Sequence, residues 1–97
     1  MKKIIVVLGF ATAIGLAAAA PAQAADRGFC RDYTRQALRQ VELARDSWRC
    51  RRWVDFGSMR WSSAWDVHFD WCRGASYGDA NHERNERRRA LERCRYG

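Results

Sequence analysis

The chain has very little proline, and it has no lysine beyond its third residue. Its 97 residues include a single proline, Pro21, and the only lysines are Lys2 and Lys3. The cysteines form no C-x2-C pair, the spacing that brings two ligands together in most structural zinc sites, and no C-x-x-C-H signature of covalent haem. No second long apolar run follows residue 20. These absences argue against a four-thiolate metal site, covalent haem and a membrane span in the main domain, so we expect neither a metal nor a cofactor.

Residues 1–24 have the pattern of a bacterial signal peptide. Two lysines precede an uncharged apolar run over residues 4–20, and the sequence Pro-Ala-Gln-Ala then supplies small residues for cleavage. The run is slightly shorter than the roughly 20 apolar residues of a spanning helix, although an uncleaved membrane anchor is the alternative. No cysteine occupies the cleavage site, which argues against a lipid anchor. We expect cleavage after Ala24 and a periplasmic or secreted protein, with no transmembrane segment once the leader is removed.

The remaining residues, 25–97, are enough for one domain but few for a stable hydrophobic core. Small exported domains commonly compensate with disulfides. An even number of cysteines follows the leader, which predicts two disulfides. These cysteines are Cys30, Cys50, Cys72 and Cys94.

The expected domain is strongly basic, and its positive charge comes from arginine alone. The chain has 18 basic residues, two of which are the leader lysines, so 16 arginines face 11 acidic residues and the net charge of residues 25–97 is about +5. Arginine binds carboxylates and phosphates with a planar fork and stacks on aromatic rings. An anionic partner is one explanation of this composition, and the codon bias of a GC-rich genome is the other.

Hydrophobic periodicity predicts three helices and one irregular connection. Apolar residues recur every three or four positions over residues 29–48, and Asp26 is a suitable N-cap for this helix. The period disappears in residues 49–60, which we interpret as an irregular connection. Two further helices are expected over residues 62–73 and 80–95.

The second and third expected helices differ in the apolar surface that they offer. Ser63 and Asp66 approximate a capping box for the second helix, which is apolar over most of its circumference. The third helix, which Asp79 caps, has only a thin apolar seam between its many charges. Because burial of this seam is too little to hold the helix, a disulfide near its end has to compensate. The seam consists of Ala80, Ala90, Leu91 and Cys94, with Arg84 and Arg87 at its border.

An up-down-up arrangement of these helices determines which cysteines meet. Cys30 opens the first helix and Cys72 closes the second, so the two lie at one pole. Cys50 follows the first helix and meets Cys94 at the end of the third, at the other pole. We therefore predict the pairs Cys30–Cys72 and Cys50–Cys94, one of three possible pairings. The expected fold is all-α, a small three-helix bundle cross-linked by two disulfides.

The five tryptophans have two interpretations. A few large rings suffice to build the core of a small domain. Alternatively, aromatic residues near the irregular connection form an exposed platform bordered by arginines, on which sugars or bases stack. The candidate ligand-binding residues of this platform are Arg51, Arg52, Trp53, Phe56, Arg60 and Trp61.

His68 lies near the centre of the apolar arc of the second helix. A polar ring in that position needs a hydrogen-bond partner, and Glu83 or Glu86 of the third helix is placed to supply one. The alternatives for His68 are a ligand or metal contact and acid–base chemistry, in which histidine is the usual proton shuttle near neutral pH. His82 follows the cap of a charged helix, and we expect it to be solvated.

A pattern of cysteines, aromatic residues and charges extends over nearly all of residues 25–97. The pattern is Cys30-x2-Tyr33-x3-Ala37-x2-Gln40, Cys50, Gly57, Arg60-Trp61, His68-x2-Trp71-Cys72, Glu83, Arg87, Leu91 and Cys94. It resembles small exported four-cysteine proteins, and repeats inside larger ones, of Gram-negative bacteria, a group with no known function. Arg51 stands where that group is expected to have glycine. The resemblance implies a periplasmic or secreted module and transfers no catalytic residue.

These features predict a non-enzymatic binding or envelope-support protein. The expected partner is an anionic polymer such as peptidoglycan, or an acidic protein, while nucleic acid is not favoured. One alternative is a small secreted hydrolase or nuclease that uses His68, and another is a periplasmic inhibitor or stress protein. The sequence leaves the oligomeric state open.

Overall fold

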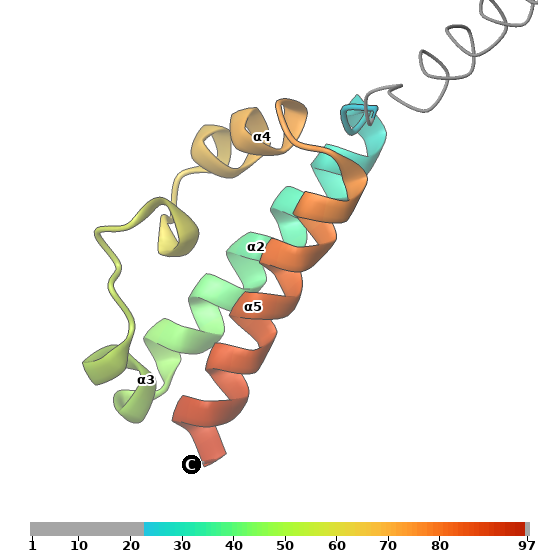
Figure 1. Cartoon of the computed structure of the whole chain (residues 1–97). Helices are drawn as coiled ribbons and strands as arrows, with labels where there is room; N and C mark the ends of the chain where they lie inside the picture. Colours follow the sequence, from blue (N-terminus) through green and yellow to red (C-terminus); the bar gives the residue numbers. More distant parts are fainter. Residues whose placement is uncertain (1–22, 97) are drawn as a thin grey trace, which may run out of the picture.

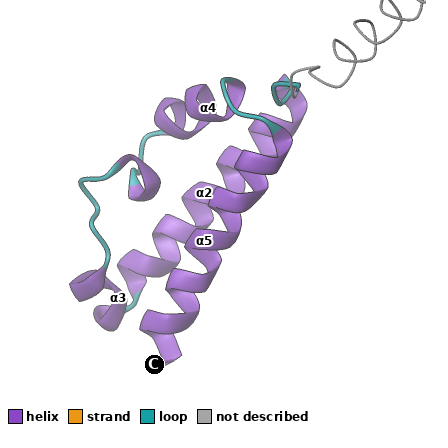
Figure 2. Cartoon of the chain, viewed as in Figure 1, coloured by secondary structure: helices purple, strands orange, loops and turns teal. Residues whose placement is uncertain are grey.

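The computed structural model describes residues 23–96, which form an all-helical fold (Figure 1). The predicted leader lies outside the described residues except for its last two, Gln23 and Ala24. Within residues 23–96 there is no β-strand, and Figure 2 shows loops before α2 and where the chain passes between helices. None of the described helices is both long enough and apolar enough to cross a membrane. The elements are α2 (Arg27–Asp46), α3 (Trp48–Trp53), the 3-10 turn η1 (Met59–Trp61), α4 (Trp65–Arg73) and α5 (Tyr77–Tyr96).

Helix α2 forms where the sequence has its clearest helical period. Asp26 is its N-cap, and the Oδ1 atom accepts a hydrogen bond from the Phe29 amide at 2.8 Å. The predicted helix and cap are confirmed, although α2 ends at Asp46 because Ser47 caps a new helix. Its buried face repeats every three or four residues and includes Cys30, Tyr33, Ala37, Val41 and Ala44.

Helices α2 and α5 run parallel and side by side (Figure 1). The chain leaves the end of α2, returns through residues 47–76, and enters α5 at the pole where α2 began; we call residues 47–76 the return segment. Each long helix has 20 residues, which corresponds to about 30 Å. The expected up-down-up bundle is confirmed, with α4 as its middle helix and α3 as a short addition.

The first part of the return segment is more regular than its sequence suggested. Ser47 caps α3, and its Oγ atom accepts a hydrogen bond from the Cys50 amide at 3.3 Å. The prediction of an irregular connection over residues 49–60 is therefore wrong for α3 and for the start of η1. Helix α3 has only six residues, too few to show a helical period in the sequence.

Helix α4 starts later than predicted, at Trp65 instead of Ser62 or Ser63. The expected capping box does not form, because the N-cap is Ala64 and it has no side-chain hydrogen bond. The Ser62 hydroxyl instead accepts a hydrogen bond from the Ala64 amide at 3.0 Å, which stabilises an extended approach to the helix.

Helix α5 starts earlier than predicted, at Tyr77 instead of Ala80. The Ser76 hydroxyl accepts a hydrogen bond from the Asp79 amide at 3.1 Å, so Ser76 has the capping role that the sequence pattern assigned to Asp79.

Two disulfides close the poles of the bundle. Cys30 is bonded to Cys72 with their Cα atoms 5.6 Å apart, and Cys50 is bonded to Cys94 with their Cα atoms 4.9 Å apart. Both Cα separations are ordinary for disulfides. The predicted pairing is confirmed, and all four sulfur atoms are engaged in covalent bonds.

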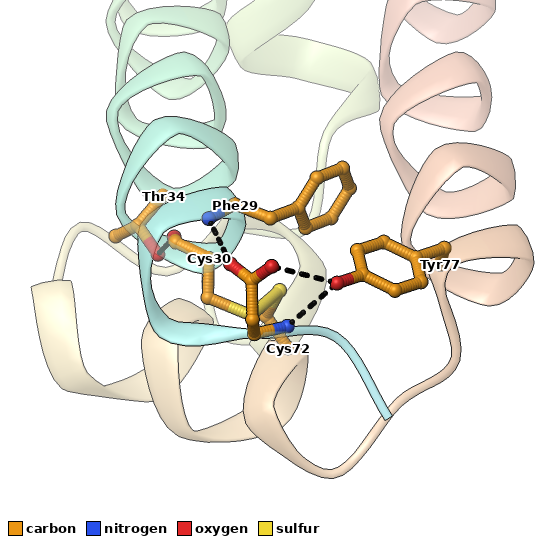
Figure 3. Close-up of a disulfide and its surroundings, with 6 residues drawn as sticks. Phe29, Cys30, Thr34, Cys72 and Tyr77 are labelled. Carbon is orange, nitrogen blue, oxygen red and sulfur yellow. Dashed lines mark hydrogen bonds between the residues drawn. A yellow bond between two sulfur atoms is a disulfide. The ribbon is translucent and has the colours of Figure 1, made fainter. Parts of the chain in front are cut away.

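Hydrogen bonds beside the Cys30–Cys72 disulfide join the start of α2 to the start of α5 (Figure 3). The Tyr77 hydroxyl donates to Asp26 Oδ2 at 2.8 Å, and its ring lies edge-on to Phe29 with the centroids 4.9 Å apart. The Phe29 amide and then the Tyr77 hydroxyl lower the pKa of the Asp26 carboxyl. This pole is therefore held by a covalent bond, a shared polar contact and an aromatic pair.

The core consists of two apolar clusters, one at each disulfide. The cluster at Cys30–Cys72 includes Tyr33 and Ala37 of α2 and Ala80 of α5. The cluster at Cys50 includes Val41, Ala44, Trp61 and Leu91. The described interior also contains polar side chains, which are Thr34, Gln40, His68 and Arg87.

Candidate functional site

An open groove of about 930 Å³ lies between α3, the residues that follow it, and the last turns of α5. Its size is within the range of small-ligand sites, roughly 300–1,000 Å³. Cys94 lines the groove, so the Cys50–Cys94 disulfide adjoins it and joins α3 to α5 at this point. We call it the tryptophan groove, after its lining residues Trp48, Trp53 and Trp61.

The three tryptophans of the groove have different roles. Trp53 is 82% exposed and Trp48 is 59% exposed, whereas Trp61 is 5% exposed and belongs to the apolar cluster at Cys50. Trp61 therefore forms the floor, and the other two indoles remain available to a ligand. Large aromatic side chains that stay in water beside a concave surface are typical of binding sites.

The groove is predominantly positive. Four arginines line it, and Asp55 is its one acidic residue. Arg49 lies against Trp48, with its Cζ atom 5.4 Å from the ring centroid. Within residues 23–96, Arg52 and Arg93 form no ion pair. Their guanidinium groups are therefore free of carboxylate partners in the part of the chain that the structure describes. The four arginines are Arg49, Arg52, Arg60 and Arg93.

Arg60 is the exception among these arginines, because Glu83 of α5 binds it. Arg60 Nη2 lies 2.6 Å from Glu83 Oε1, and Arg60 Nε donates to Glu83 Oε2 at 2.9 Å. This pair fixes η1 against α5. The hydrogen bond from Arg60 lowers the pKa of Glu83, despite partial burial that acts in the opposite direction.

Four of the predicted ligand-binding residues line the groove, and they are Arg52, Trp53, Arg60 and Trp61. Arg51 does not line it, because Arg51 Nη1 donates to the Arg45 carbonyl at the end of α2, at 2.6 Å. Phe56 is half-buried under the same Arg45, whose Cζ atom is 4.5 Å from the ring centroid. Both residues therefore support the end of α2 and do not contribute to the groove.

The sequence analysis did not assign the other lining residues to a binding site, among them Trp48, Arg49 and Arg93. Trp48 and Arg49 begin α3, and the one sequence signal for the start of this helix is its N-cap residue, Ser47. Arg93 belongs to the face of α5 that the Cys50–Cys94 disulfide brings to α3. The predicted disulfide itself was the signal that could have placed Arg93 beside the arginines of α3.

His68 lies outside the tryptophan groove, in a second cavity of about 260 Å³. It is 3% exposed, and its Nε2 atom lies 2.7 Å from the Ser62 carbonyl oxygen. Because a carbonyl only accepts, Nε2 carries the hydrogen. The prediction that Glu83 or Glu86 binds His68 is therefore wrong. His68 instead holds the segment that connects η1 to α4. His82 is exposed, as expected.

Arg87 is the most deeply buried charged residue described, at 1% exposed. Its Nε atom donates to Gln40 Oε1 of α2 at 2.7 Å, and its Cζ atom is 5.0 Å from the Tyr33 ring centroid. It lines the second cavity together with His68 and Arg60. The sequence placed Arg87 at the border of the apolar seam, whereas the structure buries it completely against α2.

Stability should depend on pH through His68. Burial lowers the pKa of His68 below its usual 6.5, while the Ser62 carbonyl acts in the opposite direction. Two groups of α5 also act on it, Arg87 lowering and Glu83 raising the pKa. Below the usual pKa the unfolded chain binds more protons at this residue than the folded chain does. Stability is therefore lost as the pH falls through this range.

We expect the Tm to fall between about pH 7.5 and pH 5.5, and His68→Gln to reduce this dependence. Glu83 stays ionised in this window, because its pKa lies below 4.5. Thermal unfolding followed by circular dichroism at both pH values measures the effect, with His82→Gln as the exposed control. Equal pH dependence in the wild type and His68→Gln would rule out His68 as the source.

Comparisons with models of known families, with curated proteins and with solved structures find no match to this chain.

Proposed function

We propose that the protein is a non-enzymatic, exported binding protein whose tryptophan groove holds a segment of an anionic glycan, with peptidoglycan as the expected polymer. The observation that carries the proposal is the combination of two exposed indoles, Trp48 and Trp53, with arginines that lack carboxylate partners. The predicted leader and the two disulfides agree with an exported protein.

The exposed indoles favour a ligand with flat, partly apolar faces. A sugar ring presents C–H groups on one face and hydroxyl groups at its edge, so an indole packs on the first while polar residues bind the second. Asp55 and Ser58 also line the groove and supply an acceptor and a hydroxyl. The Asp55 carboxylate suits sugar hydroxyls, because it accepts the hydrogen bonds that they donate.

The arginines favour a ligand with carboxylate groups. A guanidinium binds a carboxylate through two parallel hydrogen bonds, and such charge-assisted bonds are stronger than neutral ones. Three arginines without carboxylate partners among the described residues, Arg49, Arg52 and Arg93, against the single carboxylate of Asp55 give the groove a net positive field that attracts acidic polymers. Peptidoglycan carries both required features, because its sugar strands bear peptides with free carboxylates.

Binding without catalysis is supported by the position of the titratable groups. His68 does not line the groove, and its Nε2–H is committed to the Ser62 carbonyl. Among the described lining residues, Asp55 is the one carboxylate, and its Oδ1 atom accepts a hydrogen bond from the Gly57 amide at 2.9 Å. General acid–base catalysis needs paired groups within reach of the same bond. The groove residues therefore favour holding a glycan over cleaving it.

Co-sedimentation of the oxidised protein with purified peptidoglycan tests the proposal. Arg52→Gln should weaken binding by about tenfold, because it removes one charge-assisted hydrogen-bonding group. Arg51→Gln is the matched control, since Arg51 precedes it in the same helix and lies outside the groove. Binding of the wild type should decrease as salt rises from about 50 to 500 mM.

Three results would contradict the proposal. The first is an equal loss of peptidoglycan binding in Arg51→Gln and Arg52→Gln. The second is peptidoglycan binding that does not respond to salt, and the third is retention on the neutral glycan chitin equal to that on peptidoglycan. Selective capture of an acidic protein with no retention on peptidoglycan would replace the glycan with a protein partner.

A further inference from the structure

Arg87 carries a buried positive charge that its neighbours compensate only in part. Its Nη1 atom lies 3.8 Å from Glu83 Oε2, which is beyond hydrogen-bond distance. Its Nη2 atom has no hydrogen-bond partner among the protein atoms of the described residues. Because a buried charged group is costly unless it is paired, this atom calls for a partner from outside the chain.

Glu83 does not neutralise the second cavity, because Arg60 takes both of its carboxylate oxygens. Arg60 and Arg87 both line the cavity, so two guanidinium groups face one carboxylate there. His68 adds no charge near neutral pH, since it is held as the neutral ring by burial. The groups around the cavity therefore carry one uncompensated positive charge, which a monoanion would balance.

We propose that the second cavity is a binding site for a carboxylate, held by the Nη1–Nη2 edge of Arg87. Gln40 occupies the Nε atom of Arg87, and Nη2 on the opposite edge has no hydrogen bond to protein atoms of the described residues. That edge has the fork geometry that matches a carboxylate. A phosphate dianion fits less well, because one of its charges stays uncompensated in a buried site.

The walls and size of the cavity indicate what kind of group is attached to the carboxylate. Tyr33, Val67 and Trp71 supply apolar surface, which suits a short hydrocarbon attached to the carboxylate. The volume of about 260 Å³ is well above the roughly 30 Å³ that one water molecule occupies in the liquid. Met59 also lines the cavity and is 62% exposed, so a flexible side chain stands where the cavity meets solvent.

The carboxylate has two possible sources, which are a free small acid and an acidic group of the ligand in the tryptophan groove. Arg60 lines both cavities, so the two sites adjoin at this residue. Only the second source depends on the proposed function. Under the first source, Arg87→Met leaves affinity for glycan fragments unchanged, whereas under the second it lowers that affinity by about tenfold.

Acetate is the probe for the site itself. In the wild type, acetate at about fivefold excess over its Kd should raise the Tm by roughly 4–8 °C relative to chloride at equal ionic strength. Arg87→Met should abolish the shift, while Arg88→Met should retain it, because Arg88 is the exposed neighbour. Nuclear magnetic resonance of the Arg87 Nε–Hε group in the wild type gives a second measurement that needs no variant.

The expected spectrum shows an Arg87 Nε–Hε shift that saturates with acetate and stays constant with chloride. Equal effects of acetate and chloride, or an acetate response that persists in Arg87→Met, would overturn the carboxylate site. A constant Arg87 resonance throughout the acetate titration would do the same, and it would leave water as the partner of Nη2. None of these outcomes bears on glycan binding at Trp53 and Arg52.

Discussion

Replacing Cys50 and Cys94 together with alanine should lower the free energy of unfolding by about 4 kcal/mol and abolish ligand binding in the tryptophan groove. The two residues are separated by 44 positions, so their bond removes a large amount of conformational entropy from the unfolded chain. The effect is severe because α5 buries little apolar surface, with Leu91 as its largest apolar buried residue. In the folded state, the same bond joins the two walls of the groove.

The matched control is the pair of alanine substitutions at Cys30 and Cys72. These residues are 42 positions apart, so the expected loss of stability is similar, but this bond lies at the opposite pole of the bundle. Urea denaturation measures stability, and glycan binding is measured in sucrose, which favours the folded state. The Cys30 and Cys72 variant should retain binding under these conditions. Equal loss of binding in both variants would show that the Cys50–Cys94 bond has no specific role in the groove.

Trp61→Ala should destabilise the protein by about 3–5 kcal/mol, the usual cost of removing a large buried aromatic side chain. Trp61 is 5% exposed and packs in the cluster that contains Val41, Ala44 and Leu91. Trp53→Ala should change stability by less than about 0.5 kcal/mol, because that side chain is 82% exposed. Its effect is expected on binding, where loss of one stacking indole costs roughly 1–3 kcal/mol.

Urea denaturation and glycan titration of both variants separate these roles. Trp61→Phe serves as the conservative variant, since it retains an aromatic ring in the cluster and should recover much of the lost stability. A large loss of stability in Trp53→Ala would mean that this indole is a structural residue. Unchanged glycan affinity in the folded Trp53→Ala variant would remove Trp53 from the binding site.

The parts of the fold that the sequence predicted are those set by long patterns. Helix α2 has an uninterrupted apolar period and a good N-cap, so its position followed from its own residues. The disulfide pairing followed from placing three helices up, down and up, because that path leaves each cysteine near only one other. Both features depend on many residues at once, which makes them robust to errors at helix ends.

The features that sequence reasoning missed depend on single tertiary contacts. Ser63 and Asp66 form a capping pattern, yet His68 binds the Ser62 carbonyl and the chain stays extended up to Ala64. A local pattern contains no information about this contact. The late start of α4 therefore goes together with two contacts of Ser62, one with His68 and one with the Ala64 amide.

Only part of the candidate site could be predicted, because some of its residues come together through single tertiary contacts. Trp53 and Arg52 are close in sequence, so their shared surface was visible as a cluster of aromatic and basic residues. Arg93 joins them only through the Cys50–Cys94 bond, and Arg87 is buried only because Gln40 and Tyr33 of α2 face it. One charged helix thus supplies both a groove arginine and an interior arginine, which composition alone does not distinguish.

The most direct test of glycan binding uses the five tryptophans as internal reporters. Trp48, Trp53 and Trp61 line the groove, whereas Trp65 stacks with Phe69 and Trp71 packs against Tyr33, outside it. Each indole gives its own Nε1–H signal in a nitrogen-correlated spectrum of the oxidised protein titrated with soluble peptidoglycan fragments. We predict saturable shifts for Trp48 and Trp53, with Trp65 unchanged. No shift at low salt, or shifts centred on Trp65, would contradict the groove as the binding site.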